Sequence, residues 1–361
     1  MINQEFQNAI DSLSELRTYK NNFKENILIK SIKVYEKKCD EEPLVSLVIP
    51  TANRSETLIE TLKSINSNKK IFPFEVIIVD NSGYIENSLL NEKINIVKSF
   101  SFDAISYYIN EANIGMVGNF NRCYELARAE WIGMIHDDDL ITDSYMEEIY
   151  RCLHNSIVDE KTALIKTRYL FFRDGEQFPH YDSMNRGGLR KINKFDTLIK
   201  GTGPTAAPTC GMLIRKKAII EVGGYCKAFY PSMDHILGYQ FQKKGYKTLE
   251  TEDVLGYYRI CDNASTKKET FIGFAIMDTV FRRYLYEDNR FFRMIGLLFE
   301  KLNYRIMVDK LLYLARMGLN DELKISDVDF LNSYDKCYIR NFIYRIVKKS
   351  VNQFIRNRVY I

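Results

Sequence analysis

Short, continuous apolar runs alternate in the chain with longer stretches in which apolar residues return every three or four positions. Residues 44–50 (LVSLVIP) and 74–80 (FEVIIVD) are rich in Val and Ile, which is typical of strands buried on both faces of a parallel sheet. Leu58, Leu62 and Ile65 lie between them at helical spacing. The same pattern predicts further strands at 105–110, 131–135 and 162–172. The alternation predicts an α/β fold with a mostly parallel, Rossmann-like sheet flanked by helices.

The chain is expected to have three parts, because the alternation is confined to its middle. Apolar residues recur at helical spacing near the start, at Phe6, Ile10, Leu13 and Leu16. We therefore expect a helical N-terminal extension over 1–42, the α/β domain over 43–268 and a helical C-terminal region over 269–361. Within the middle part, 173–209 is rich in loop-forming residues and is expected to cover the functional site.

Composition narrows the class of protein. The chain is 46% hydrophobic and 27% charged, as in ordinary globular proteins, and its net charge of +4 gives no reason to expect binding to nucleic acid. No stretch reaches the roughly 20 apolar residues of a membrane-spanning helix, and the start does not resemble a secretory signal. Seven scattered cysteines without a Cys-x-x-Cys pair favour reduced thiols in a cytoplasmic setting, without a zinc site.

The most unusual feature is the segment 131–141, WIGMIHDDDLI, in which a buried strand runs into three consecutive aspartates, Asp137, Asp138 and Asp139. Three adjacent carboxylates repel one another and need solvent, a basic side chain or a metal ion to neutralise them. Mg²⁺ and Mn²⁺ prefer such oxygen ligands and are often shared with the phosphates of a substrate. A solvated turn is the alternative interpretation.

Two further polar clusters end predicted strands, at 50–53 (PTAN) and at Asp80. Ligands of open parallel sheets bind beyond the carboxyl ends of the strands. All three clusters are therefore expected at one edge of the sheet.

Four segments in this order carry a family resemblance: PLVSLVIPTANRSETLIETLKSI, FEVIIVDNS, NEANIGMVGNFNRCYELARAEWIGMIHDDDLI and VGGYCKAFYPSMDHILGYQFQKKGYK. Over roughly residues 44–266 the chain resembles family 2 glycosyltransferases. These are inverting enzymes of the GT-A fold that use nucleotide-sugar donors. The individual motifs are loose, whereas the ordered set is specific.

The resemblance implies a nucleotide site, usually for uridine. It places Pro50, Thr51, Asn53 and Asp80 around the nucleoside, and Asn113, Gly115 and Asp137 near the nucleotide. A carboxylate such as Asp80 can accept the imide N–H of a uracil. The alternative for Asp80 is a turn-forming role in DNSG, and Asn-x-Gly alone could be an ordinary loop.

The resemblance also implies a site for Mn²⁺ or Mg²⁺ at the triplet, with Asp138 as the main ligand and Asp139 supporting it. His136 stands where the family often has its first Asp. Whether His136 is a ligand or an orienting residue stays open at this point.

The family takes its catalytic base from an acidic motif after a Gly-Gly-aromatic turn. Gly223-Gly224-Tyr225 is followed by PSMDHIL, so Asp234 is the implied base, with Met233 in the position that Glu usually occupies. The alternative is a helix N-cap. Arg259, in YYRICDNAS, resembles a basic residue near the diphosphate, although a lone Arg is more often part of an ordinary ion pair.

Beyond Asp335 the chain carries only basic charged residues, while apolar residues recur at helical spacing. A basic amphipathic helix on an anionic membrane and a helix packed on the domain both fit this pattern.

Together with the resemblance, these features predict a cytoplasmic, metal-dependent inverting glycosyltransferase, with a peripheral position on the inner face of the cell membrane as the alternative location. It would move a sugar from a nucleotide donor, most simply a UDP-sugar, to a hydroxyl of a glycan or lipid-linked glycan in a bacterial surface-polysaccharide pathway. A non-catalytic nucleotide-sugar or cation-binding module on the same fold is the alternative.

Overall fold

The structure is a computed structural model, and the statements below concern the residues that it describes. These are 2–83, 86–174, 188–193, 210–261, 267–281, 284–285, 288–291 and 293–294. Most of the predicted loop 173–209 and of the predicted helical region 269–361, including its basic end, lies outside them.

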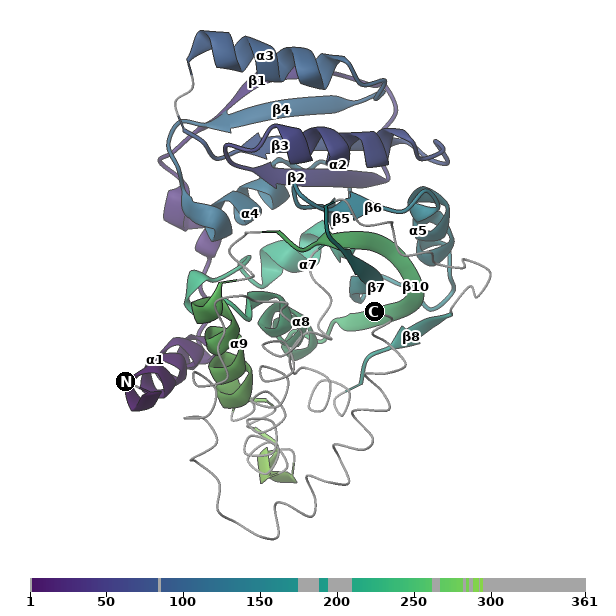
Figure 1. Ribbon diagram of the computed structural model, residues 1–361. Coiled ribbons are helices and arrows are strands. Elements are labelled where there is room, and N and C mark those ends of the chain that lie inside the picture. The colour runs from purple at the N-terminus through teal and green to yellow at the C-terminus, as the bar shows by residue number, and fades with distance from the viewer. Residues whose placement is uncertain are drawn as a thin grey trace.

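A ten-stranded sheet forms the centre of the molecule (Figure 1). Its first half consists of four parallel strands in the order β4, β3, β2 and β5. They are β2 (Val45–Thr51), β3 (Phe74–Asp80), β4 (Ile105–Asn110) and β5 (Trp131–Met134). All residues of β2 are buried, and so are all but the first of β3. The continuous apolar runs are therefore buried on both faces, as the sequence predicts.

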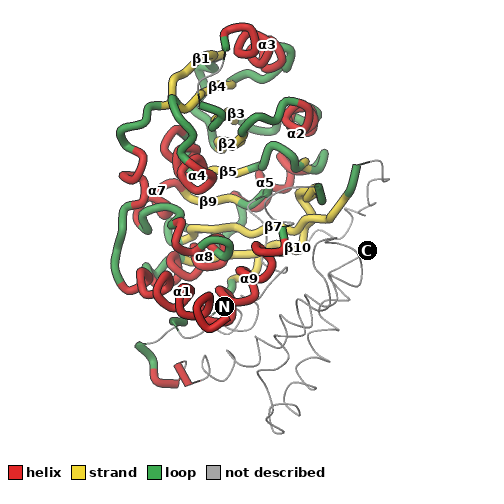
Figure 2. Tube along the Cα trace, turned by 60° about the vertical axis from the view of Figure 1, so that its left-hand side comes forward, coloured by secondary structure: helices red, strands yellow, loops and turns green. Residues whose placement is uncertain are grey.

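Helices cover both faces of this half. Leu47 and Ile49 pack with α2 (Glu56–Asn66), α3 (Asn87–Lys98) and α5 (Tyr145–Leu153) on one face. Val48 lies between them in the chain and therefore points to the other face, where it packs with α4 (Gly115–Leu126). Figure 2 shows α2 and α5 on one side of the sheet and α4 and α7 (Lys216–Glu221) on the other.

The second half of the sheet is mixed. β9 (Leu213–Arg215) runs antiparallel to both β5 and β7 (Thr162–Phe172), and β7 runs parallel to β10 (Lys247–Arg259). β6 (Leu140–Ile141) and β8 (Leu189–Lys191) pair antiparallel with β10. The acidic triplet lies between β5 and β6, so both of its ends are anchored in the sheet.

The N-terminal extension contains a strand that the sequence pattern did not predict. α1 (Ile2–Ser14) and the short 3₁₀ helices Glu15–Arg17 and Asn22–Asn26 fit the expected helical extension. β1 (Ser31–Lys37), however, pairs antiparallel with β4 at the edge of the sheet. Its register shifts between Lys33 and Tyr35, which breaks the alternation that marks a half-buried strand. The expectation of a wholly helical extension was wrong for these residues.

The N-terminal extension also contacts residues much later in the chain, between 223 and 284. The backbone N–H and the side-chain amide of Asn22 both donate to the carbonyl of Gly223, at 2.9 and 3.0 Å. Lys243, in α8 (Met233–Lys243), donates to the carbonyl of Leu16 at 3.1 Å. Tyr284 donates to the carbonyl of Ile10 at 2.9 Å, beyond α9 (Lys268–Phe281). The extension therefore covers the turn that leads to α8.

Among the described residues, no helix combines the length and the apolar character needed to cross a membrane.

Two glycines with nearly the same backbone provide a test of this packing. Gly223 and Gly245 have φ of +85° and +86°, but a Cβ at Gly223 would overlap the backbone oxygen of Lys20, whereas one at Gly245 would meet nothing within 4 Å. We expect Gly245→Ala to lower the free energy of unfolding by about 1 kcal/mol, because alanine is strained in this left-handed backbone conformation. Gly223→Ala should cost about 3 kcal/mol or more. Urea unfolding of both variants measures the difference, and equal losses would contradict the close packing.

Candidate functional site

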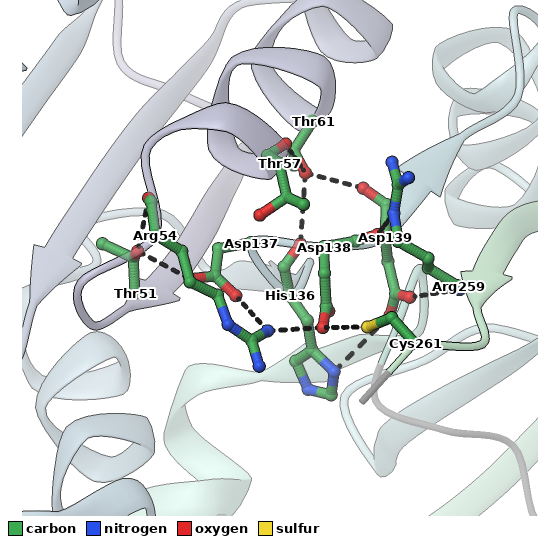
Figure 3. Close-up of polar contacts among 10 residues, drawn as sticks. All are labelled: Thr51, Arg54, Thr57, Thr61, His136, Asp137, Asp138, Asp139, Arg259 and Cys261. Atoms are coloured by element: carbon green, nitrogen blue, oxygen red, sulfur yellow. Dashed lines mark hydrogen bonds and ion pairs between the residues drawn. The ribbon is translucent and has the colours of Figure 1, made fainter. Parts of the chain in front are cut away.

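The acidic triplet is buried. Asp137, Asp138 and Asp139 are 6%, 5% and 0% exposed, which rules out the solvated turn considered as the alternative. Their loop meets the carboxyl end of β2, where Thr51 donates a hydrogen bond of 2.6 Å to Asp137 (Figure 3). The carboxylates therefore need partners from within the protein or from a ligand.

One partner is Arg54, which the sequence analysis did not single out. Its Nη1 lies 2.5 Å from Oδ2 of Asp138 and 3.3 Å from Oδ1 of Asp137. Arg54 belongs to the loop between β2 and α2, more than eighty residues away in the chain. The only sequence signal was the charge itself, since a buried acidic cluster requires a cation and PTANRS supplies one at the same edge of the sheet.

His136 is the second cation of the cluster. Its Nδ1 lies 3.5 Å from Oδ2 of Asp139, and its ring stacks on Phe120 with a centroid distance of 5.5 Å. Burial lowers the pKa of His136, but the carboxylates of Asp139, Asp138 and Asp234 outweigh burial and raise it to about 9. The imidazole is therefore protonated at neutral pH in the chain alone.

Asp139 is held on several sides. Its Oδ1 accepts the backbone N–H of Arg259 at 2.9 Å, and its carbonyl accepts the hydroxyl of Thr61 at 2.8 Å. Its Oδ2 is buried and, among the described residues, makes no hydrogen bond beyond the ion pair with His136. Burial raises the pKa of both Asp139 and Asp137, in each case against the effect of nearby cations.

His136, Asp138 and Asp139 can each offer one ligand atom, and these atoms lie within 4.8 Å of one another. Two carboxylates and an imidazole suit Mn²⁺, and the oxygens also suit Mg²⁺. The buried Oδ2 of Asp139 makes no hydrogen bond to a described residue and has the ion pair with His136 at 3.5 Å, so such an ion could bind it in place of the imidazolium. The chemistry of this group therefore fits a divalent cation.

Asp80 lies at the end of β3 and is fully buried. Its Oδ2 accepts from Lys93 and from Tyr107, each at 2.7 Å, and its Oδ1 accepts from the backbone and the hydroxyl of Ser82. The hydroxyl of Ser82 in turn accepts the backbone N–H of Asn53 at 2.9 Å, where φ is +56°. Asp80 thus fixes the loop around Asn53, and a nucleobase could reach its carboxylate only by replacing one of these donors.

Asn113 and Gly115 belong to a network of amides. The side chain of Asn113 accepts from Gly115 N at 2.8 Å and from the amide of Asn81 at 2.9 Å. Asn81 also accepts the backbone N–H of Ile114 and the amide of Asn110. The network links the ends of β3 and β4 to the start of α4, on the same edge as Asp80.

Arg259 is a buried link between elements. Its Nε donates to the carbonyl of Asp138 at 2.8 Å, and its two terminal nitrogens form ion pairs with Glu60 and Asp174. The guanidinium carbon lies over the ring of Phe172, 4.7 Å from the ring centroid. The side chain is 4% exposed. In this structure the guanidinium is therefore bound to partners within the protein, as in an ordinary ion pair.

Asp234 lies in the first turn of α8, whose N-cap residue is Ser232. The N-cap alternative for Asp234 was therefore wrong. Its Oδ1 is buried and makes no hydrogen bond within the described part of the chain. Burial raises the pKa of Asp234, against the lowering effects of His235, His136, Tyr225 and Lys166. The charge of Asp234 raises the pKa of His136 and that of His136 lowers the pKa of Asp234, so the two groups interact electrostatically.

The turn before α8 is positioned by Asn121, which the sequence analysis also missed. Its side chain accepts the N–H of Tyr225 at 2.8 Å and donates to the carbonyl of the same residue at 2.9 Å. A buried Asn inside a helical pattern was the available signal, because a buried amide needs polar partners.

Comparisons with known proteins agree with this architecture. Residues 46–223 match the family described as Glycosyl transferase family 2. A curated relative, the uncharacterized glycosyltransferase MJ1057 of Methanocaldococcus jannaschii, is 29% identical over 120 residues, which are 32% of this chain and 39% of that protein. The matched segment thus spans about two fifths of the length of that relative.

Among solved structures, mannosyltransferase PcManGT from Pyrobaculum calidifontis, in complex with GDP-Man and Mn²⁺, superposes with a TM-score of 0.50 at 12% identity. The match covers 87% of this chain and 84% of that one. S. aureus TarS 1-349 in complex with UDP-GlcNAc gives a TM-score of 0.46 at 15% identity, covering 86% and 91% of the two chains.

The mixed sheet with helices on both faces is the GT-A fold, as predicted. Residues 46–223, just under half of the chain, are similar to glycosyltransferase family 2.

The interior position of Arg259 leads to a prediction about stability. Arg259→Met keeps an apolar stem but removes the donors to Asp138, Glu60 and Asp174, and we expect it to lower the free energy of unfolding by about 2 kcal/mol. Urea unfolding without nucleotide measures this. Lys70→Met, which removes an exposed ion pair with Asp103, is the control and should change little. A residue that only bound phosphate would leave the stability of the ligand-free protein unchanged.

Proposed function

We propose that the protein is a metal-dependent inverting glycosyltransferase. It transfers a sugar from a nucleotide diphosphate donor, in the first instance a UDP-sugar, to a hydroxyl of a glycan or lipid-linked glycan. The observation that supports this most directly is the group of the half-buried His136 and the buried Asp138 and Asp139. Their ligand atoms lie within 4.8 Å of one another at the edge of the sheet where such folds bind ligands. Similarity to family 2 supports the same reaction class.

On the donor side, Asp138 and Asp139, with His136, would hold Mn²⁺ or Mg²⁺. When bound, the ion supplies positive charge to the diphosphate as it leaves. The loop of Pro50, Thr51 and Asn53 would contact the nucleoside, together with Asn113 and Gly115. Asp80 supports this loop through Ser82.

On the acceptor side, Asp234 would accept the proton of the attacking hydroxyl. The acceptor oxygen forms a bond to the anomeric carbon while the bond from that carbon to the diphosphate breaks, so the configuration inverts. A carboxylate whose pKa is raised by burial is a stronger base than an exposed one. Its Oδ1 has no hydrogen-bond partner among the described residues and is free to receive that proton.

The donor side leads to the first test. With Mn²⁺ present, UDP or a UDP-sugar should raise the melting temperature, because a ligand that binds only the folded state stabilises it. At about 100 times Kd the gain is about 2.7 kcal/mol. A parallel series with GDP and GDP-mannose tests whether the protein binds guanine in place of uracil. Asp138→Ala should abolish the metal-dependent part of the shift. No shift with any nucleotide would remove the main support for the proposal.

The acceptor side leads to a second test. Asp234→Asn should lower sugar transfer at least about a hundredfold while donor binding is retained. Retained transfer would contradict the role of Asp234, whereas a wild-type protein that binds donors but never transfers would favour the non-catalytic module.

The raised pKa of Asp234 gives this variant a second readout. The folded state binds the proton more tightly than the unfolded state, so ionisation at neutral pH disfavours folding. Asp234→Asn should therefore raise the free energy of unfolding at neutral pH, and the gain should shrink as the pH falls. The wild-type kcat/KM should fall on the acid side at a pH above the range of an exposed aspartate.

A cytoplasmic location beside the membrane would suit a lipid-linked acceptor. The basic residues after Asp335 would then face anionic headgroups.

A further inference from the structure

Arg54 occupies the position of a counter-ion in the acidic cluster. Its Nη1 lies 2.5 Å from Oδ2 of Asp138, the carboxylate that we expect to bind the metal, and 3.3 Å from Asp137 (Figure 3). We propose that Arg54 is an exchangeable counter-ion. It competes with the divalent cation for Asp138 in the donor-free protein and turns to the donor diphosphate when cation and nucleotide bind together. This inference rests on the proposed function.

The competition follows from the geometry. Asp138 belongs both to the Arg54 ion pair and to the group of possible metal ligands. A guanidinium at hydrogen-bond distance and a divalent cation on the same carboxylate would repel each other strongly, because both charges would lie within a few ångströms. His136 also faces the cluster, with its Nδ1 3.5 Å from Oδ2 of Asp139. A metal ion must displace at least part of this arrangement.

Arg54 is suited to exchange because of its exposure. Its side chain is 37% exposed, whereas those of Asp137 and Asp138 are 9% and 7% exposed. Among the described contacts, Nη1 is the only nitrogen of this side chain that donates a hydrogen bond. Arg259, by contrast, is 4% exposed and is held by three elements. Of these two arginines beside the triplet, one is fixed and the other can turn outward at small cost.

The chemistry of a diphosphate gives Arg54 its second partner. A guanidinium donates paired hydrogen bonds to phosphate oxygens and stays charged at every relevant pH. Arg54 follows Thr51 and Asn53 directly in the loop that we assign to the nucleotide. An arginine released from Asp138 would therefore lie beside the leaving group of the donor.

The consequence is positive coupling between metal and nucleotide. The cation should bind weakly alone, because it must replace Arg54, and more tightly once a diphosphate offers Arg54 another anion. By linkage, the metal must increase the affinity for nucleotide by the same factor.

The test is direct measurement of Mn²⁺ binding, by electron paramagnetic resonance of free Mn²⁺ or by calorimetry, first without nucleotide and then with saturating UDP or GDP. Arg54→Gln should bind Mn²⁺ about three- to tenfold more tightly than wild type without nucleotide, since a partly exposed ion pair no longer competes. With the diphosphate present, this advantage should disappear. Arg54→Lys keeps a charge and should stay close to wild type without nucleotide.

Arg128→Gln is the matched control. Arg128 is 48% exposed and pairs at 2.8 Å with Glu75, which is 4% exposed, at the opposite end of β3 from Asp80. Its loss should leave Mn²⁺ affinity unchanged, with and without nucleotide. Melting curves of all variants show whether each one is folded.

The outcomes separate this inference from the proposed function. If wild type binds Mn²⁺ and nucleotide, and Asp138→Ala abolishes the metal, the metal site stands. Under those conditions, unchanged or weaker Mn²⁺ binding by folded Arg54→Gln without nucleotide would overturn the counter-ion role alone. If Asp138→Ala binds Mn²⁺ as well as wild type, the metal assignment fails instead.

Discussion

The charge balance of three buried carboxylates is the constraint on which the rest of the site depends. Asp137, Asp138 and Asp139 lie between two strands of the sheet and cannot be neutralised by water. The protein supplies Arg54 from the loop after β2 and His136 from the end of β5. If all five groups are ionised, three negative and two positive charges leave one negative charge in excess. The cluster is therefore held together by the protein and remains attractive to a cation.

The same constraint joins segments that are far apart in the chain. Arg259, near the end of β10, holds the backbone of the triplet through Asp138 and Asp139. On the other side, Asn121 in α4 and Asn22 in the N-terminal extension hold the turn that leads to Asp234. The family match covers residues 46–223, so the proposed base Asp234 and the supporting Asn22 lie outside it, whereas Asn121 lies within it. The extension is thus part of what positions the acceptor side.

The sequence predicts the fold well where the pattern is local. β3, β4 and β7 span the predicted residues, because each is rich in β-branched and aromatic residues. β1 escaped notice because its register shift breaks the alternation. The triplet was visible as a motif, but its partner Arg54 was not, since contacts between loops separated by more than eighty residues leave no local pattern. Likewise, Arg259 could be identified as a charge near the site, whereas its burial depends on tertiary packing.

The two sides of the proposed donor site differ in how firmly they are built. Around the predicted nucleoside loop, Asp80, Ser82 and Asn53 form a chain of hydrogen bonds that holds Asn53 at a positive φ. Such a fixed loop loses little conformational freedom when a ligand binds, which favours selective recognition. Around the triplet, the balance of charge depends on a half-exposed arginine and on a histidine whose protonation depends on its neighbours. A rigid recognition surface beside an adjustable charge cluster suits a reaction in which the ligand stays in place while negative charge moves onto its diphosphate.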